Sequence, residues 1–152
     1  MEVTSFCAQV AEVEVDPETG QVRLHKLVTA HDVGTVLNPL THQGQIEGGV
    51  VQGIGQALTE QLLVQDGAVS SLHLGDYKLP TDMDIPELTT VLVETKGGPA
   101  PYAGKAVGEL SNVAVPAAIA NAVFDAIGVR LTELPVTAEK VYTGLRAKEH
   151  GK

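Results

Sequence analysis

One carboxylate, Glu109, ends a glycine-rich loop and is flanked by apolar residues. The loop, residues 97–109, reads Gly-Gly-Pro-Ala-Pro-Tyr-Ala-Gly-Lys-Ala-Val-Gly-Glu, and a largely apolar run over 113–127 follows it. Burial disfavours the charged form of a carboxylate and raises its pKa toward the range in which a general base works best at neutral pH. Glycines would let the main chain of this loop come close to a bound group. The loop is therefore the first candidate for a site, with Glu109 as its acid–base residue.

Three glutamines form a second candidate surface. Gln45, Gln52 and Gln56 recur at spacings of 7 and 4, and five glycines lie in the same segment at positions 44, 48, 49, 53 and 55. In a helix each glycine costs ~1 kcal/mol relative to alanine, so something must compensate. Close packing of the helix against a sheet is one explanation. The other is a ligand rich in donors and acceptors, met by the amide face and approached by the backbone at the glycines.

Familiar nucleotide and metal motifs are absent from the sequence. A phosphate-binding loop ending at Gly104-Lys105 would need glycine at position 99 and Ser or Thr at 106, where the chain has proline and alanine. A dinucleotide fingerprint beginning at Gly53 would need glycine at 58, which is leucine. The five histidines show no metal-ligand spacing, and His31-Asp32 favours a structural role in a turn.

The first half of the chain predicts a hairpin followed by a helix. Residues 5–15 and 21–30 alternate as strands do, and residues 16–20, Asp-Pro-Glu-Thr-Gly, are typical of a turn. Over residues 41–62 the apolar positions recur every four residues, which predicts a helix capped by Thr41.

The second half predicts shorter strands and two helices. A small hairpin is expected at 65–67, a loop at 79–86 and a strand at 87–95. Residues 115–127 are almost wholly Ala, Val and Ile, which predicts a helix buried on all sides, with Pro116 in its first turn and Gly128 as its cap. Thr137 caps a last helix to about residue 145, before a charged, fraying tail. Together these elements predict an α+β fold, in which β-hairpins and a mixed sheet pack against a Gly-rich helix and a buried apolar helix.

The composition of the chain argues against several classes of binding partner and of metal site. The 152 residues suffice for one domain, and the net charge of −9 argues against a nucleic-acid or anionic-membrane partner, since both need clustered Lys and Arg. Cys7 is the single cysteine, so the chain can form no internal disulfide and no cysteine-ligated cluster. No signal-peptide pattern occurs, and no apolar segment approaches the ~20 residues that span a bilayer. We expect a soluble, cytoplasmic protein.

Several separated motifs resemble one family. They are His31-Asp32-Val33-Gly34, Asn38-Pro39, Gly-Gln-Ile-Glu-Gly-Gly at 44–49, Gln-Gly-Ile-Gly-Gln-Ala-Leu at 52–58, Gly-Lys-Ala-Val-Gly-Glu at 104–109, Ala-Ile-Ala-Asn-Ala-Val at 118–123 and Leu-Pro-Val-Thr-Ala-Glu-Lys-Val at 134–141. In this order they are similar to the molybdenum hydroxylases, the xanthine dehydrogenase and aldehyde oxidase family. The resemblance covers essentially the whole chain.

The resemblance implies a reaction and a set of site residues. In such enzymes a molybdenum–molybdopterin cofactor oxidises an electron-poor carbon of a heterocycle or aldehyde, the added oxygen comes from water, and a glutamate acts as general base. Glu109 matches that glutamate, and Gln45 matches a glutamine beside the pterin and the metal. The backbone of Gly104, Lys105, Ala106, Val107 and Gly108 would lie near the cofactor. No side chain of this chain is expected to ligate a metal.

The resemblance also implies partners. Residues 1–152 correspond to the C-terminal part of the family's molybdenum cofactor-binding domain, and the remaining part would be needed to complete the pocket. Iron–sulfur clusters and FAD would lie only on partner domains or subunits, and the molybdopterin would be bound as such or as its cytosine dinucleotide. The alternative is a catalytically idle structural or assembly module of the same fold.

Overall fold

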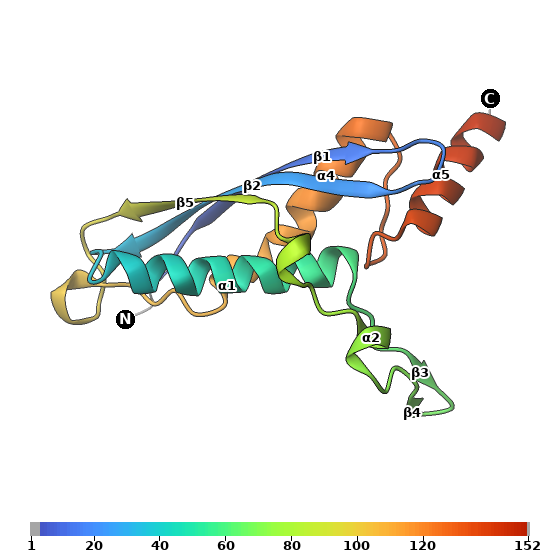
Figure 1. Ribbon diagram of the computed structural model, residues 1–152. Helices are drawn as coiled ribbons and strands as arrows, with labels where there is room; N and C mark the ends of the chain where they lie inside the picture. The colour runs from blue at the N-terminus through green and yellow to red at the C-terminus, as the bar shows by residue number, and fades with distance from the viewer. Residues whose placement is uncertain (1–3, 152) are drawn as a thin grey trace.

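A three-stranded sheet forms one layer of the protein, whose computed structural model describes residues 4–151 (Figure 1). Strand β1 (Cys7–Val15) pairs antiparallel with β2 (Val22–Gly34), and β2 pairs in parallel with β5 (Glu87–Glu94). The predicted hairpin, the mixed sheet and the α+β class are confirmed. Strand β2 continues beyond residue 30 because its last residues pair with β5, an interaction that local alternation does not reveal.

Helix α1 (Pro39–Leu58) lies under this sheet (Figure 1). Its N-cap is Asn38 and not Thr41, because Asn38 Oδ1 accepts a hydrogen bond from the Thr41 backbone N–H at 3.2 Å and proline is well suited to the first helical turn. The helix also ends four residues before the predicted residue 62. There the Val136 N–H donates to the Ala57 carbonyl at 2.7 Å and replaces a helical partner.

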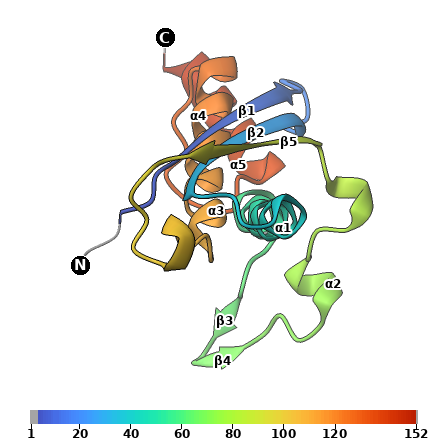
Figure 2. The same ribbon diagram turned by 90° about the vertical axis from the view of Figure 1, so that its left-hand side faces the viewer.

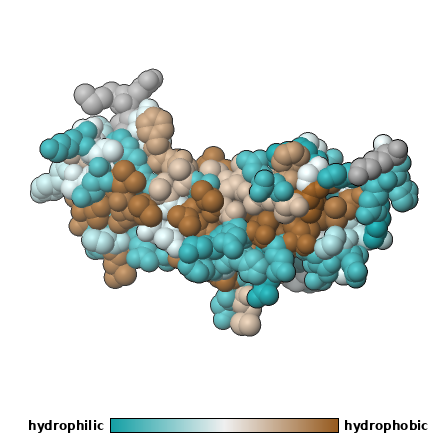
Figure 3. Space-filling view, turned by 90° about the horizontal axis from the view of Figure 1, so that it is seen from above, coloured by the Kyte–Doolittle hydropathy of each residue, from teal (hydrophilic) through white to brown (hydrophobic). Residues whose placement is uncertain are grey.

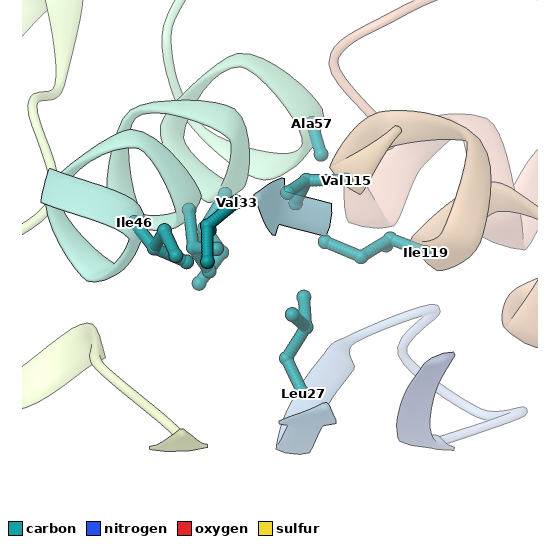
Figure 4. Packing of buried hydrophobic residues seen from close by; sticks show 8 residues of the cluster. Leu27, Val33, Ile46, Ala57, Val115 and Ile119 are labelled. Carbon is teal, nitrogen blue, oxygen red and sulfur yellow. The ribbon is translucent and has the colours of Figure 1, made fainter. Parts of the chain in front are cut away.

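The main core lies between the sheet and two helices, α1 and α4 (Val115–Ile127). Figure 4 shows Leu27 and Val33 of β2 pointing toward Ile46 and Ala57 of α1 and toward Val115 and Ile119 of α4. All six are fully buried. Burial of side chains of the size of Leu or Ile contributes roughly 1.5–3 kcal/mol each, so this cluster fixes α1 and α4 against the sheet.

Helix α4 has the predicted bounds but not the predicted burial. Val115, Ile119 and Val123 are its buried residues, whereas Phe124 is 40% exposed. The expectation that the helix is buried on all sides is therefore wrong for the described residues, because only one face meets the rest of the chain.

The expectation that no apolar segment approaches the length of a membrane span is also too strict. Residues Leu110–Ile127 are 18 long and apolar enough to pass that test by length and composition. Here, however, they form two helices, α3 (Leu110–Val113) and α4, with Ala114 between them, and α4 packs on β1. The segment therefore behaves as a core element with one uncovered face.

A second, smaller cluster holds helix α5 (Ala138–His150) beside the hairpin. Val123, Val136 and Val141 are its buried members. Thr137 caps α5 as predicted, since its hydroxyl accepts from the Lys140 N–H at 3.3 Å. The helix runs to His150, so the predicted fraying tail from residue 146 is largely helical.

One arm leaves the body of the protein (Figures 1 and 2). It contains the predicted small hairpin, β3 (Val64–Gln65) and β4 (Ala68–Val69), followed by α2 (Leu74–Tyr77). The predicted loop 79–86 includes one 3-10 turn, η1 (Asp82–Asp84). A second such turn, η2 (Pro101–Ala103), leads into the loop of Glu109.

The outer face of the sheet is uncovered, with an apolar part near the start of β1 and the end of β5 and a charged part that contains the Glu14–His25 and Lys26–Glu87 ion pairs. Phe6 is 69% and Val10 68% exposed, and Val91 and Val93 of β5 are partly exposed on the same face. Figure 3, which looks down on the sheet, shows hydrophobic residues in a band along it.

Candidate functional site

Glu109 lies immediately before α3, at the end of the loop that follows η2. The preceding residue, Gly108, has φ +43°, a left-handed conformation that favours glycine and turns the chain into the helix. The Glu109 side chain is exposed and makes no capping hydrogen bond to α3. Its predicted burial is therefore wrong for the described residues, because no element of this part of the chain covers the start of α3.

Two of the three predicted glutamines reach the segment around Glu109. Gln45 Nε2 donates to the Gly108 carbonyl at 2.9 Å, and Gln52 Oε1 accepts from Asn112 Nδ2 at 3.2 Å. Gln56 is exposed, one turn farther along α1. The amide face of α1 thus contacts the segment on both sides of Glu109, through the Gly108 carbonyl on one side and the Asn112 side chain on the other, and these partners lie 63 and 60 residues away in sequence.

Some glycines of α1 permit close packing of the helix, and others leave open surface that a ligand could approach. A Cβ on Gly49 would collide with Ser111, and one on Gly53 would lie 2.6 Å from Val115 Cβ, so these two permit close packing against α3 and α4. Gly44 and Gly48 are different, since a Cβ there would meet nothing within 4 Å. They leave an open strip of helix surface beside Gln45.

The loop between η2 and Glu109 is tied to the end of β2. The Lys105 N–H donates to the Val33 carbonyl at 3.0 Å, and Gly104 forms a bridge with Gly34. The Lys105 ammonium lies 2.5 Å from Asp32 Oδ2, with both side chains nearly buried at 12% and 10% exposure. Lys105 therefore anchors the loop to the sheet, while Ala106 and Gly108 remain exposed.

Asp32 is held in its charged form by this contact. Hydrogen bonds from Lys105 Nζ and from the Thr95 hydroxyl, each at 2.5 Å, lower the pKa of Asp32 from its ordinary value to about 2. The structural role predicted for this pair agrees with the contacts of Asp32, which also accepts from the Gly34 N–H at 3.1 Å, but the predicted turn is wrong because His31 and Asp32 both lie within strand β2.

A buried polar group behind α3 was missed in the sequence. Gln9 Nε2 donates to Thr29 Oγ1 at 3.0 Å and to the Ser111 carbonyl at 2.7 Å, and Thr29 Oγ1 lies 2.6 Å from His31 Nε2. Burial lowers the pKa of His31, which keeps the ring neutral at physiological pH. The available signal was the strand alternation, because it places Gln9, Thr29 and His31 on the face of the sheet that also carries Leu27.

Two further observations concern metal binding and the shape of the surface around the candidate site. Among residues 4–151 no group of three or more His, Cys, Asp or Glu side chains is placed to hold a metal ion. A hollow of about 880 Å³ lies at the far end of α1, where Ile54, Leu58 and Met83 are among its lining residues. None of the predicted site residues lines it, so the candidate site is an open surface on this chain.

Comparison with known proteins identifies the family. The family model described as a molybdopterin cofactor-binding domain matches residues 1–86 of the 152. The chain belongs to this family. The resemblance to the xanthine dehydrogenase and aldehyde oxidase group is thereby confirmed.

Sequence similarity to individual proteins extends over most of the chain, beyond the residues that the family model matches. The xanthine dehydrogenase molybdenum-binding subunit of Escherichia coli O157:H7 is 37% identical over 140 residues, which is 91% of this chain and 19% of that subunit. The nicotine 6-hydroxylase large subunit of Paenarthrobacter nicotinovorans is 43% identical over 134 residues, 85% of this chain and 16% of that subunit. The chain therefore spans less than a fifth of the length of these relatives.

A solved structure agrees with the fold. The aldehyde oxidoreductase of Desulfovibrio gigas superimposes with a TM-score of 0.85 at 35% identity, over 93% of this chain and 15% of that one. The sheet and helices described above are thus similar to one part of that enzyme.

Proposed function

We propose that this chain forms one wall of the cofactor site of a molybdenum-dependent hydroxylase, in which Glu109 is the general base. The observation that supports this best is the exposed carboxylate of Glu109 beside Gly108, whose carbonyl is bound by the exposed Gln45 at 2.9 Å. Membership in the molybdopterin cofactor-binding family supplies the class of cofactor.

The residues present fit such a group as one side of a pocket. Gly44 and Gly48 leave open space on the surface of α1 next to Gln45, and Gln45 carries both a donor and an acceptor. The backbone of Gly104, Lys105, Ala106, Val107 and Gly108 would line the same pocket. When bound, the cofactor supplies two-electron redox chemistry.

Glu109 would accept the proton released as a water-derived oxygen attacks the substrate carbon. Its flanking backbone is fixed from α1, so the carboxylate can be oriented although it makes no capping bond itself. Water would be excluded by the remaining part of the molybdenum-binding subunit, because nothing in residues 4–151 covers Glu109.

The substrate would be a small heterocycle or aldehyde. The names of the relatives support this class, since they include a xanthine dehydrogenase, a nicotine 6-hydroxylase and an aldehyde oxidoreductase. Electrons would leave through iron–sulfur clusters and FAD on partner subunits, since Cys7 alone cannot hold a cluster. The cofactor would be molybdopterin or its cytosine dinucleotide, in a cytoplasmic enzyme.

The test is purification of the tagged chain from its native source together with whatever copurifies. We expect molybdenum by elemental analysis, a pterin released on denaturation, and oxidation of a heterocycle or aldehyde by the complex. A tag-only purification is the control. A stable complex of the full molybdenum-binding subunit that holds neither metal nor pterin would contradict the proposal and favour the catalytically idle module.

A further inference from the structure

The short segment that carries Glu109 does little to fix its own orientation. Helix α3 has four residues, and its backbone bonds, Leu110 N–H to Val107 O at 3.0 Å and Asn112 N–H to Glu109 O at 3.1 Å, close single turns. A single turn is only marginally stable without support from other elements. The position of Glu109 must therefore depend on side chains from elsewhere in the fold.

Those side chains come from two directions. From α1, Gln45 binds the Gly108 carbonyl and Gln52 binds the Asn112 side chain. From β1, Gln9 Nε2 donates to the Ser111 carbonyl at 2.7 Å, and the Cys7 thiol lies 3.7 Å from the Leu110 carbonyl. The shortest of these four contacts is the one from Gln9.

Gln9 is itself fixed from the sheet. It lies directly opposite Thr29 in the β1–β2 pairing, and its Nε2 also donates to the Thr29 hydroxyl at 3.0 Å. Thr29 and His31 are each 1% exposed, and their side chains are 2.6 Å apart. A chain of hydrogen bonds thus runs from the interior of β2 through Gln9 to the backbone of α3.

This polar group is costly for stability alone. Gln9 Oε1, His31 Nδ1 and the hydroxyl of the fully buried Ser111 have no hydrogen-bond partner among the described residues. Each buried, unpaired polar atom lowers the stability of the fold, whereas the same face of β2 carries the apolar Leu27 and Val33 at equivalent positions. Apolar residues would fill this space at lower cost, so the group calls for a reason other than packing.

We propose that Gln9 is a positioning residue for Glu109. By holding the Ser111 carbonyl against Thr29, it sets the direction of α3 and hence the place of the carboxylate that precedes it. This inference rests on the proposed function of Glu109.

The main test variant is Gln9→Met, assayed in the enzyme assembled with the rest of its molybdenum-binding subunit. Methionine keeps the length of the side chain and removes the donor. We expect kcat to fall roughly 10- to 100-fold, as small displacements of a reacting group do, with KM and molybdenum content close to the parent. Gln21→Met, the same change at an exposed position of the hairpin turn, is the matched control and should leave kcat unchanged.

A double variant separates positioning from general destabilisation. If Gln9 acts through Glu109, then Gln9→Met should cause little further loss in a Glu109→Gln background, whereas independent structural damage would multiply the two losses. Multiplied losses, or parental kcat in Gln9→Met, would overturn the positioning role. Normal turnover of Glu109→Gln alone would instead overturn the proposed function itself.

Thr29→Val covers the case in which Gln9→Met does not fold. Valine matches the shape of threonine and removes the hydroxyl that anchors Gln9 and that also contacts His31 Nε2. We expect kcat to fall here too, by a smaller factor than in Gln9→Met, while the molybdenum content stays unchanged. Parental kcat in a folded, metal-loaded Thr29→Val enzyme would overturn the proposal.

Discussion

Glu109 owes its place to contacts made by its neighbours. Gly108 supplies the left-handed turn, Gln45 binds the carbonyl before Glu109, and Gln9 binds the carbonyl two residues after it. The side chain itself is left free and exposed. At the scale of single residues, therefore, the amide side chains of Gln45 and Gln9 hold the backbone beside Glu109, while the Glu109 carboxylate itself is exposed.

Replacing Gln45 tests the α1 side of this arrangement. In the assembled enzyme, Gln45→Ala should slow turnover roughly fivefold or lower molybdenum content, because a neutral hydrogen bond contributes about 1 kcal/mol. Gln43→Ala is the matched control, since the exposed Gln43 side chain bonds to Glu47 on the same helix and does not contact the Glu109 segment in the described residues. Parental rate and parental metal content in Gln45→Ala would show that Gln45 is only a helix residue.

The ion pair between Lys105 and Asp32 predicts a pH dependence of stability. Because the pKa of Asp32 is lowered to about 2 in the folded protein, its stabilising effect is present above the ordinary carboxyl range near pH 4 and is lost as the pH falls toward 2. Asp32→Asn should lower the thermal midpoint at pH 7, and this difference should shrink steadily as the assembled subunit is studied between pH 5 and pH 3. A difference that stayed constant with pH would contradict the assignment.

At the scale of elements, local patterns predicted most of the fold. The β1–β2 hairpin, the small hairpin near Asp66, the bounds of α4 and the Thr137 cap follow from turn residues, alternation and capping, all of which act within a few positions. The predicted ends of β2 and α1 were wrong, because pairing with β5 and the bond from Val136 to Ala57 involve residues distant in sequence. The predicted cap at Thr41 was wrong for a local reason, since Asn38 accepts the Thr41 N–H and the helix begins at Pro39.

The candidate site was predictable only in part for the same reason. Glycines and glutamines near one another in sequence indicated a surface on α1, but the contact of Gln45 with Gly108 joins two segments 63 residues apart. The burial expected for Glu109 failed because apolar neighbours in sequence, such as Val107 and Leu110, do not enclose it in space.

The glycines of α1 provide a prediction at this scale. Gly53→Ala should destabilise the assembled subunit by ~1–3 kcal/mol, because its Cβ would lie 2.6 Å from Val115 Cβ and 2.9 Å from the Asn112 carbonyl oxygen. Gly44→Ala meets nothing within 4 Å and should leave chemical-denaturation stability unchanged or raised, yet lower molybdenum retention. Equal stability effects of the two changes would contradict the division between packing and open glycines.

At the scale of the whole molecule, this chain leaves many large apolar side chains exposed. The outer face of the sheet carries Phe6 and Val10, the arm exposes Leu72 at 73%, and the η1 turn exposes Met83 at 88%. Contiguous exposed apolar surface of this kind marks contact with other protein.

The isolated chain should therefore self-associate. We expect light scattering at tens of micromolar to give species larger than the 15.9 kDa monomer, and Val10→Lys, on the outer face of the sheet, to reduce their size. Lys replacing Gln21, a residue already exposed and polar, is the control for added charge. A stable monomer for the parent chain would contradict this account of its surface.

The most direct test of the central claim is the turnover of the assembled enzyme with Glu109→Gln. Glutamine keeps the size and polarity of the side chain but cannot accept a proton, so turnover should fall by ~10²–10⁴ while molybdenum content and the thermal midpoint stay close to the parent. Normal turnover combined with lost stability would contradict the account and make Glu109 a structural carboxylate at the start of α3.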